Sequence, residues 1–429
     1  MKNTRQWTLL GVAIAGFLSA GAAQSATMLG AYIDNDGWNT APIDQFNTDA
    51  AKSLAVVNLF SSFGQDWGSL NVQVSNIVSR KATPLITWMP SISSRPDANL
   101  LGEISSGQWD GYIDGWINSL KLWQASYPTD QKPTVLLRFA HEFNGNWYPW
   151  SNDPDGLKTA WRYLHNRFAQ AGVTGVEWVW CANNVSVDNY NDITRYYPGN
   201  DVVNWTALDG YNWGSNYSFT QWKGFAEVFS APYTTLVTNY PDKPVLLAEV
   251  ASAEPQDLPN ADYGMSGDDS DAGQSKAVWV QDMYTRMLAE YPAIRAVTWF
   301  NTNKELSWAL NGVGNTGLAA YNTAIADSRY TGTFTAWVAP TTVTEPTKTR
   351  AAKGGGGGKR STTTTSTTLM AAESTTLEGI QQERDSGLQR ALAVSKMPAV
   401  VGTALLAREA QGFRRLPPAA RAVLREDVR

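Results

Sequence analysis

Between residues 28 and 337, the chain alternates short apolar runs, rich in β-branched residues, with longer amphipathic stretches. Short apolar runs bounded by turns predict buried strands, whereas apolar residues three and four positions apart predict helices. The strands predicted in this way are residues 28–33, 54–60, 84–88, 134–140, 176–181, 206–211, 244–249 and 295–300. Helical segments lie between them, among them residues 43–53, 111–125, 156–171, 219–239 and 274–290.

Eight strands that alternate with helices over roughly 300 residues predict an α/β fold, a (β/α)8 TIM barrel. An open, doubly wound parallel sheet alternates in the same way and is the other fold that this pattern allows. A nucleotide-binding sheet of that kind has a glycine-rich loop after its first strand. Here the sequence Asp34-Asn35-Asp36-Gly37-Trp38 follows instead, which favours the barrel.

The two ends of the chain differ from this barrel domain, which we place at residues 27–340. Lys2 and Arg5 precede an apolar stretch and then the small residues Ala20-Gly21-Ala22-Ala23, as in a secretory signal peptide over residues 1–26. An uncleaved membrane anchor is the alternative, but the apolar stretch is short for a span. We therefore predict a secreted or periplasmic protein with no membrane span once the signal is removed.

The C-terminal part reads as low-complexity sequence. Residues 341–372 are rich in Thr and Gly and predict a flexible linker. Residues 373–429 are rich in Ala and Arg and predict a tail that is disordered or forms short helices. No Trp occurs beyond Trp337, and Phe413 is the only aromatic residue there.

Charge and residue counts exclude some classes of function. Residues 27–340 contain 18 basic and 31 acidic residues, net −13, whereas residues 341–429 contain 14 and 8, net +6. The whole chain has net charge −5, which argues against a nucleic-acid-binding protein. Cys181 is the only cysteine and lies in a predicted strand, so we expect a buried, inert thiol. With only two histidines besides, we expect no protein-built metal site and no cofactor.

The strongest chemical pattern is the segment Arg138-Phe-Ala-His-Glu-Phe-Asn-Gly-Asn-Trp-Tyr-Pro-Trp150. A strand that ends in a carboxylic acid, hydrogen-bond donors and flat rings supplies what the cleavage of a sugar needs. Glu249 ends the seventh predicted strand after three apolar residues, where an unpaired buried charge would be costly. Parallel barrel strands all end at one face, so Glu142 and Glu249 are expected to lie on the same face. Retaining glycosidases use two such carboxyl groups about 5–5.5 Å apart.

The segment resembles the acid/base motif of glycoside hydrolase family 26, whose members are retaining endo-β-mannanases and related β-glycanases. The resemblance extends over about 300 residues, in at least four separated motifs in the right order. Its most specific part is His141-Glu142-x-Asn144-Gly145-x-Trp147. It implies that Glu142 is the general acid/base after the fourth strand and that Glu249 is the nucleophile after the seventh.

The same resemblance implies further substrate-binding residues. His141 would lie close to the sugar at the cleavage point, and the hydroxyl of Tyr211 would donate a hydrogen bond to the nucleophile. Trp299 would form the floor under that sugar, with Trp147 and Trp150 as further walls. For each tryptophan, ordinary core packing is the competing interpretation.

Three more polar residues are interpreted from their place in the pattern. Arg138, inside the fourth strand, is expected to point into the barrel and to pair with a carboxylate near the nucleophile, because an unpartnered inward arginine would be costly. Asn183 and Asn184 follow the fifth strand, where polar groups can reach a substrate. His165 lies in a helical stretch and is interpreted as structural.

The leading hypothesis is a secreted, monomeric, retaining endo-β-glycanase that binds a polysaccharide, with β-1,4-mannan the commonest substrate of the family. Tyr148-Pro149-Trp150 differs from the more aromatic run of typical mannanases, which leaves the sugar open. The alternatives are the same chemistry on β-1,3-1,4-glucan, β-1,3-xylan or an exopolysaccharide. A non-catalytic carbohydrate-binding barrel is a further alternative, which the presence of both carboxyl groups disfavours.

Overall fold

The computed structural model describes residues 26–255 and 274–337, and it confirms the predicted barrel. The sheet closes because β1 (Thr27–Ile33) pairs in parallel with both β2 (Val56–Ser62) and β8 (Ile294–Asn301). The strands between them pair in sequence order and in parallel: β3 (Thr83–Met89), β4 (Val135–Phe139), β5 (Val176–Asn183), β6 (Trp205–Asn212) and β7 (Val245–Ser252). All eight predicted strands are therefore present, with ends that shift by a few residues.

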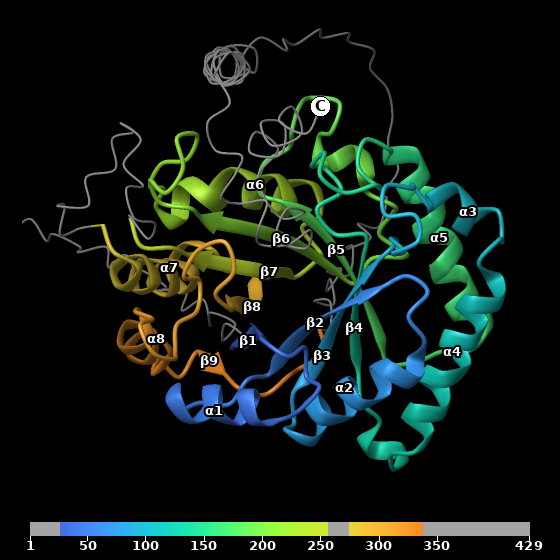
Figure 1. The fold of residues 1–429 in the computed structure, drawn as a ribbon, viewed down its shortest axis with the longest axis horizontal. Helices are drawn as coiled ribbons and strands as arrows, with labels where there is room; N and C mark the ends of the chain where they lie inside the picture. Colours follow the sequence, from blue (N-terminus) through green and yellow to red (C-terminus); the bar gives the residue numbers. More distant parts are fainter. Residues whose placement is uncertain (1–25, 256–273, 338–429) are drawn as a thin grey trace, which may run out of the picture.

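Helices surround the strands on the outside of the barrel (Figure 1). They are α1 (Ala41–Asp49), α2 (Trp67–Ser79), α3 (Leu101–Ser105), α4 (Asp110–Ala125), α5 (Pro154–Gln170), α6 (Phe225–Asn239), α7 (Lys276–Glu290) and α8 (Leu318–Ile325). Two 3-10 helices, η1 (Thr129–Gln131) and η2 (Ile193–Tyr196), lie in connections, and the two-residue strand β9 (Tyr330–Thr331) adds to β1. Among the helices in the described ranges, none is both long and apolar enough to span a bilayer.

Helix α6 starts six residues later than the apolar pattern predicts. The carboxylate of Glu227 accepts a hydrogen bond from the backbone N–H of Gly224, which fixes the first turn at this point. The helix that carries His165, α5, begins at Pro154, two residues earlier than predicted, and the side chain of Asp153 accepts a hydrogen bond from Gly156 N.

The core has two layers because successive strand residues point to opposite faces. Residues on the inner face form a small cluster inside the barrel: Met28, Ala55, Val56, Leu85, Leu136, Val179, Cys181, Trp205, Ala207, Leu246, Ala248 and Ala296. Residues on the outer face pack against the helices in a much larger cluster. Towards the carboxyl ends of the strands the buried side chains become polar, and Asn58, Thr87, Arg138, Asp209 and Glu249 lie there.

Strand β7 carries an irregularity that the sequence pattern does not predict. Leu247 pairs with Leu208 of β6, but Glu249 pairs with Asp209, so β7 has one extra residue at this point. The pairing with β8 shows the same extra residue, since Leu247 and Val250 pair with Val297 and Trp299. A bulge of this kind shifts the alternation of side chains. Ala248 and Glu249 therefore both lie on the inner side, although they are adjacent.

The predicted linker and tail lie outside the described residues, as does the predicted signal peptide apart from its last residue. Those predictions stay predictions.

Candidate active site

The loop that follows β4 presents Glu142 in an unusual backbone conformation. Ala140 and Glu142 have φ angles of 47° and 52°, in the left-handed region that residues with a side chain rarely adopt. The backbone N–H of Glu142 donates to Cys181 O of the neighbouring strand (2.9 Å). Such conformations carry strain and occur at functional sites, where surrounding contacts maintain them. The side chain of Glu142 is left 8% exposed.

Two donors bind the carboxyl group of Glu142. Asn183 Nδ2 donates to Oε1 (2.9 Å), and Trp147 Nε1 donates to Oε2 (2.7 Å). Asn144 fixes the backbone of Asn183 from both sides, since it accepts from Asn183 N (2.8 Å) and donates to Asn183 O (2.9 Å). A Cβ at Gly145 would lie 2.5 Å from the indole of Trp147, so only glycine allows this ring position. The Asn, Gly and Trp of the motif thus all serve to place one carboxyl group.

Burial raises the pKa of Glu142, and the neighbouring charge of Glu249 raises it further. The hydrogen bonds from Asn183 and Trp147 and the charge of Arg138 act in the opposite direction, but the net shift is upward. A raised pKa keeps a carboxylic acid protonated at higher pH, as a general acid requires.

Glu249 lies in a different environment at the end of β7. Arg138 Nη2 donates to its Oε1 (2.6 Å), and the hydroxyl of Tyr211 donates to its Oε2 (2.5 Å). Charged and hydroxyl donors of this kind stabilise and orient a carboxylate. The structure therefore places Arg138 and Tyr211 next to the predicted nucleophile.

Arg138 is fully buried and contacts two carboxylates and one hydroxyl. Its Nη1 lies 2.8 Å from both carboxylate oxygens of Asp209, and its Nε lies 2.8 Å from Thr87 Oγ1. Burial alone would lower the pKa of Arg138, but the charges of Asp209 and Glu249 outweigh burial and raise the pKa well above its ordinary value. The side chain of Arg138 therefore stays positively charged and lies between two carboxylates, one from β6 and one from β7.

His141 is held by the aromatic residues that follow it. Its Nε2 lies 3.1 Å from the hydroxyl of Tyr148, and its backbone oxygen accepts a hydrogen bond from Trp150 Nε1 (2.9 Å). The rings of Tyr148 and Trp150 are stacked, with centroids 4.3 Å apart and planes at 10°. Phe60 of β2 also lies near this ring, with its centroid 6.0 Å from that of His141.

The structure does not bring every predicted residue to the site. Trp299 is fully buried on the outer side of β8, where its ring contacts Trp279 of α7. Its neighbour Phe300 has the inward position instead, stacked on Tyr32 (4.9 Å) and edge-on to Tyr211 (5.7 Å). Side chains alternate along a strand, so a shift of one residue moves the aromatic ring from the site to the helix layer.

Two further residues lie behind the site. Trp150 is fully buried, so its ring supports Tyr148 and His141 and presents no face to solvent. Asn184 donates to Val228 O of α6 and anchors that helix.

His165 packs against Trp178 on the outer side of the barrel, at a centroid distance of 5.4 Å, in agreement with a structural role.

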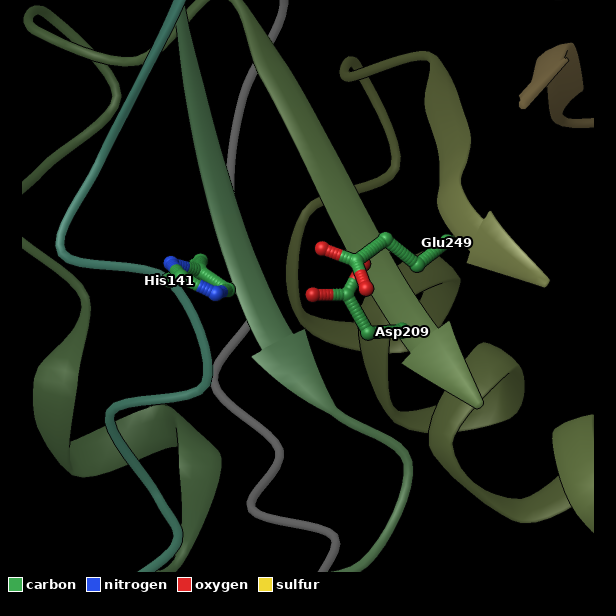
Figure 2. Close-up of side chains that lie close together, drawn as sticks. All are labelled: His141, Asp209 and Glu249. Atoms are coloured by element: carbon green, nitrogen blue, oxygen red, sulfur yellow. The ribbon is translucent and has the colours of Figure 1, made fainter. Parts of the chain in front are cut away.

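His141, Asp209 and Glu249 are the one group of possible metal ligands in the described part of the chain, with ligand atoms within 4.8 Å of one another. Figure 2 shows the two carboxylates side by side with the histidine ring facing them. Arg138 already binds both carboxylates, at 2.6 and 2.8 Å. A divalent cation would have to displace this guanidinium or lie beside its charge, so the donor set does not fit a metal.

Sequence reasoning missed three residues that the site uses. Asp209 lies two positions before Tyr211 on the same strand, so period-two alternation alone would have placed both inside the barrel. To place Phe300 at the site, the strand register must be known to within one residue, and the sequence does not give it that accurately. Tyr148 was noted for its departure from the family, but its contact with His141 depends on the folded loop.

The fold and the site together define a class: a (β/α)8 barrel with two carboxyl groups, from the ends of β4 and β7, in contrasting environments. This is the arrangement of a barrel glycosidase. The chain belongs to glycosyl hydrolase family 26, whose sequence profile matches residues 23–283.

Individual relatives agree with this membership. The chain is 30% identical over 322 residues to endoglucanase H of Acetivibrio thermocellus, a match that covers 73% of this chain and 32% of that protein. It is 30% identical over 125 residues to a mannan endo-1,4-beta-mannosidase of Thermothelomyces thermophilus, covering 26% and 24% of the two chains. The chain therefore spans about a third or less of the length of these relatives.

A solved structure shares the fold. The structure of an endo-β-1,4-mannanase double mutant of Cellulomonas fimi aligns with a TM-score of 0.52 at 14% identity, over 71% of each chain.

The buried ion pairs of Arg138 predict a large effect on stability. Arg138→Met should lower the free energy of unfolding by about 3–5 kcal/mol, because Asp209 and Glu249 would stay buried without their cation. Arg162→Met is the control, since its partner Asp201 is largely exposed and that pair should contribute at most about 1 kcal/mol. Urea-induced unfolding measures both changes. Equal midpoints for the two variants would contradict the central role of Arg138.

Proposed function

We propose that this protein is a retaining endo-β-glycanase that cleaves a polysaccharide by double displacement with Glu142 and Glu249. The observation that carries the proposal is the contrast between two carboxyl groups on one barrel face. Glu142 is buried beside another acid, which favours its protonated form. Glu249 accepts hydrogen bonds from a guanidinium and a tyrosine hydroxyl, which favour its charged form.

In the first step, a carboxylate oxygen of Glu249 attacks the anomeric carbon of the sugar. The glycosidic carbon–oxygen bond breaks, and Glu142 gives its proton to the leaving oxygen. The leaving part of the polymer departs, and the remaining sugar is joined to Glu249 as an ester. Tyr211 and Arg138 hold the carboxylate in place throughout.

In the second step, Glu142 acts as a base. Its carboxylate takes a proton from water, and the water oxygen attacks the anomeric carbon while the bond to Glu249 breaks. Two inversions leave the configuration unchanged. Asn183 and Trp147 each donate to one carboxyl oxygen of Glu142, which holds the group in place for both steps.

For the substrate, we propose β-1,4-mannan, the polymer that the motif resemblance favours. A β-1,3-1,4-glucan is the second candidate, because the relative that matches over 322 residues is named an endoglucanase. The apolar N-terminal stretch supports export from the cytoplasm.

The function is tested by reducing-sugar release and product sizing on glucomannan, galactomannan, barley β-glucan, β-1,3-xylan and carboxymethylcellulose. We expect oligosaccharides from one polymer with the wild type and none with Glu249→Ala, which lacks the nucleophile. Product of retained anomeric configuration, seen by NMR, is the mechanistic readout. Hydrolysis that persists in Glu249→Ala would contradict the mechanism, and inactivity on the whole panel would contradict the proposed substrates.

The role of Glu142 is tested by Glu142→Ala on substrates with different leaving groups. The loss should be about 10²–10⁴-fold on an unactivated glycoside, which needs the proton, and much smaller on an activated aryl glycoside. Azide should partly restore turnover of the aryl glycoside, because it reacts with the glycosyl-enzyme without a general base. An equal loss on every substrate, without azide rescue, would count against the acid/base role.

The pH profile tests the hydrogen bond from Asn183. This bond lowers the pKa of Glu142, so Asn183→Ala should raise that pKa. Because Glu142 must be protonated to act as an acid, the alkaline limb of kcat/KM against pH should move to higher pH. Asn184→Ala is the neighbouring control and should leave the limb in place, since Asn184 contacts the backbone of α6. A shift to lower pH in Asn183→Ala would refute the assignment.

A further inference from the structure

We propose that an amide-lined cavity beside the ends of β1 and β8 binds one sugar residue of the substrate, away from the bond that is cleaved. The cavity has a volume of about 250 Å³. Its polar lining consists of Asp34, Gln45, Asn301, Asn303, Asn311 and Asn315. This inference rests on the proposed function and adds a binding site to it.

The four asparagines form a network that leaves donors for a ligand. Asn301 Nδ2 donates to Asn311 Oδ1 (2.9 Å), and Asn303 Nδ2 donates to Asn315 Oδ1 (2.9 Å). Asn311 and Asn315 each donate one N–H as well, to Asp49 Oδ2 (2.7 Å) and to Asn311 O (2.6 Å). Each amide nitrogen has two N–H groups and uses one of them within the described part of the chain. The second is available to a hydroxyl group.

The same network argues against a cation as the ligand. The amide oxygens of Asn301 and Asn303 accept from the backbone N–H groups of Leu310 (2.8 Å) and Ala309 (3.1 Å). Those of Asn311 and Asn315 accept from the other two amides. Each amide oxygen already accepts one hydrogen bond, and Asp34, the one carboxylate of the lining, accepts from Thr302 Oγ1, so the lining offers few of the six to eight oxygen ligands that calcium requires. A neutral ligand rich in hydroxyl groups fits this donor set better.

The size and the apolar lining also fit one sugar unit. Ile33, Pro42 and Ala309 add carbon surface between the polar groups. A sugar ring presents both hydroxyl groups and C–H faces, so it needs a lining of both kinds. Pockets for drug-sized ligands measure about 300–1,000 Å³, and the present cavity is smaller, so it accommodates a single ring.

The location connects the cavity to the catalytic residues. Ile33 and Asn301 end β1 and β8, directly after Tyr32 and Phe300. The stacked rings of Tyr32 and Phe300 face the centre of the barrel, where Phe300 contacts Tyr211, so the next residue of each strand lies on the outer side of the sheet. β1 and β8 lie across the barrel from β4 and β5, where Glu142 would protonate the leaving group. The proposal therefore assigns the cavity to the part of the sugar chain that would stay bound to Glu249.

Three variants test the cavity by kinetics. Gln45→Trp fills it and should lower kcat/KM about tenfold on a hexasaccharide, with no change on an aryl disaccharide that ends short of it. Gln45→Ala removes one polar side chain and should give roughly a two- to tenfold loss on the hexasaccharide only. Gln170→Trp, the same change at the exposed end of α5, is the control and should match the wild type. Wild-type kinetics for Gln45→Trp on both lengths would overturn the proposal.

Binding without turnover separates this inference from the proposed function. In the Glu249→Gln protein, mannohexaose or a mixed-linkage glucan hexasaccharide should shift asparagine side-chain amide signals in NMR spectra, and Gln45→Trp should abolish the shifts. Shifts without hydrolysis of any polymer by the wild type would support the cavity and refute the catalytic function. Hydrolysis by the wild type without these shifts would support the catalytic function and refute the cavity as a sugar-binding site.

Discussion

The buried guanidinium of Arg138 is the interaction on which the site depends. Burying a charge is costly unless it is paired and hydrogen-bonded. Here the cation contacts carboxylates from β6 and β7, Asp209 and Glu249, and a hydroxyl from β3, Thr87. The side chain of Arg138, on β4, thus connects the carboxyl-terminal parts of four strands, β3, β4, β6 and β7. Glu249 would otherwise be a buried, unpaired anion, so the ion pair that positions this carboxylate also makes its burial tolerable.

Two carboxyl groups on one face can take opposite roles only if their surroundings differ. Glu249 faces the cation and a tyrosine hydroxyl, whereas Glu142 is desolvated and lies beside a second negative charge. The charge of Glu249 raises the pKa of Glu142, so Glu249 itself favours the protonated state of Glu142. In the proposed mechanism, Glu249 loses this charge when it forms the ester, and the pKa of Glu142 then falls. The proposed exchange of roles between the two steps rests on this coupling of the two carboxyl groups.

The sequence predicted the strands and the carboxyl pair because both depend on local patterns, an apolar run and a charge at its end. It did not predict the bulge in β7, which turns Glu249 inward beside Ala248. The sequence also predicted Trp299 at the site, where the structure has Phe300. Alternation fixes which residues of a strand share a face, but an error of one residue in the register reverses the two faces. Contacts such as that between Tyr148 and His141 depend on loop geometry, for which periodicity carries no information.

The buried ion pairs of Arg138 and the amides proposed to bind a sugar belong to different parts of the fold. Arg138, Asp209 and Glu249 lie on strands and are buried in a rigid network. The loop after β8 is held largely by its own amides, so it can vary without disturbing that network, whereas the loop after β4 carries Glu142 and is tied to β5. Relatives named an endoglucanase and a mannan endo-1,4-beta-mannosidase share this family. When loops vary around a fixed set of strands, proteins that share one mechanism can act on different polymers.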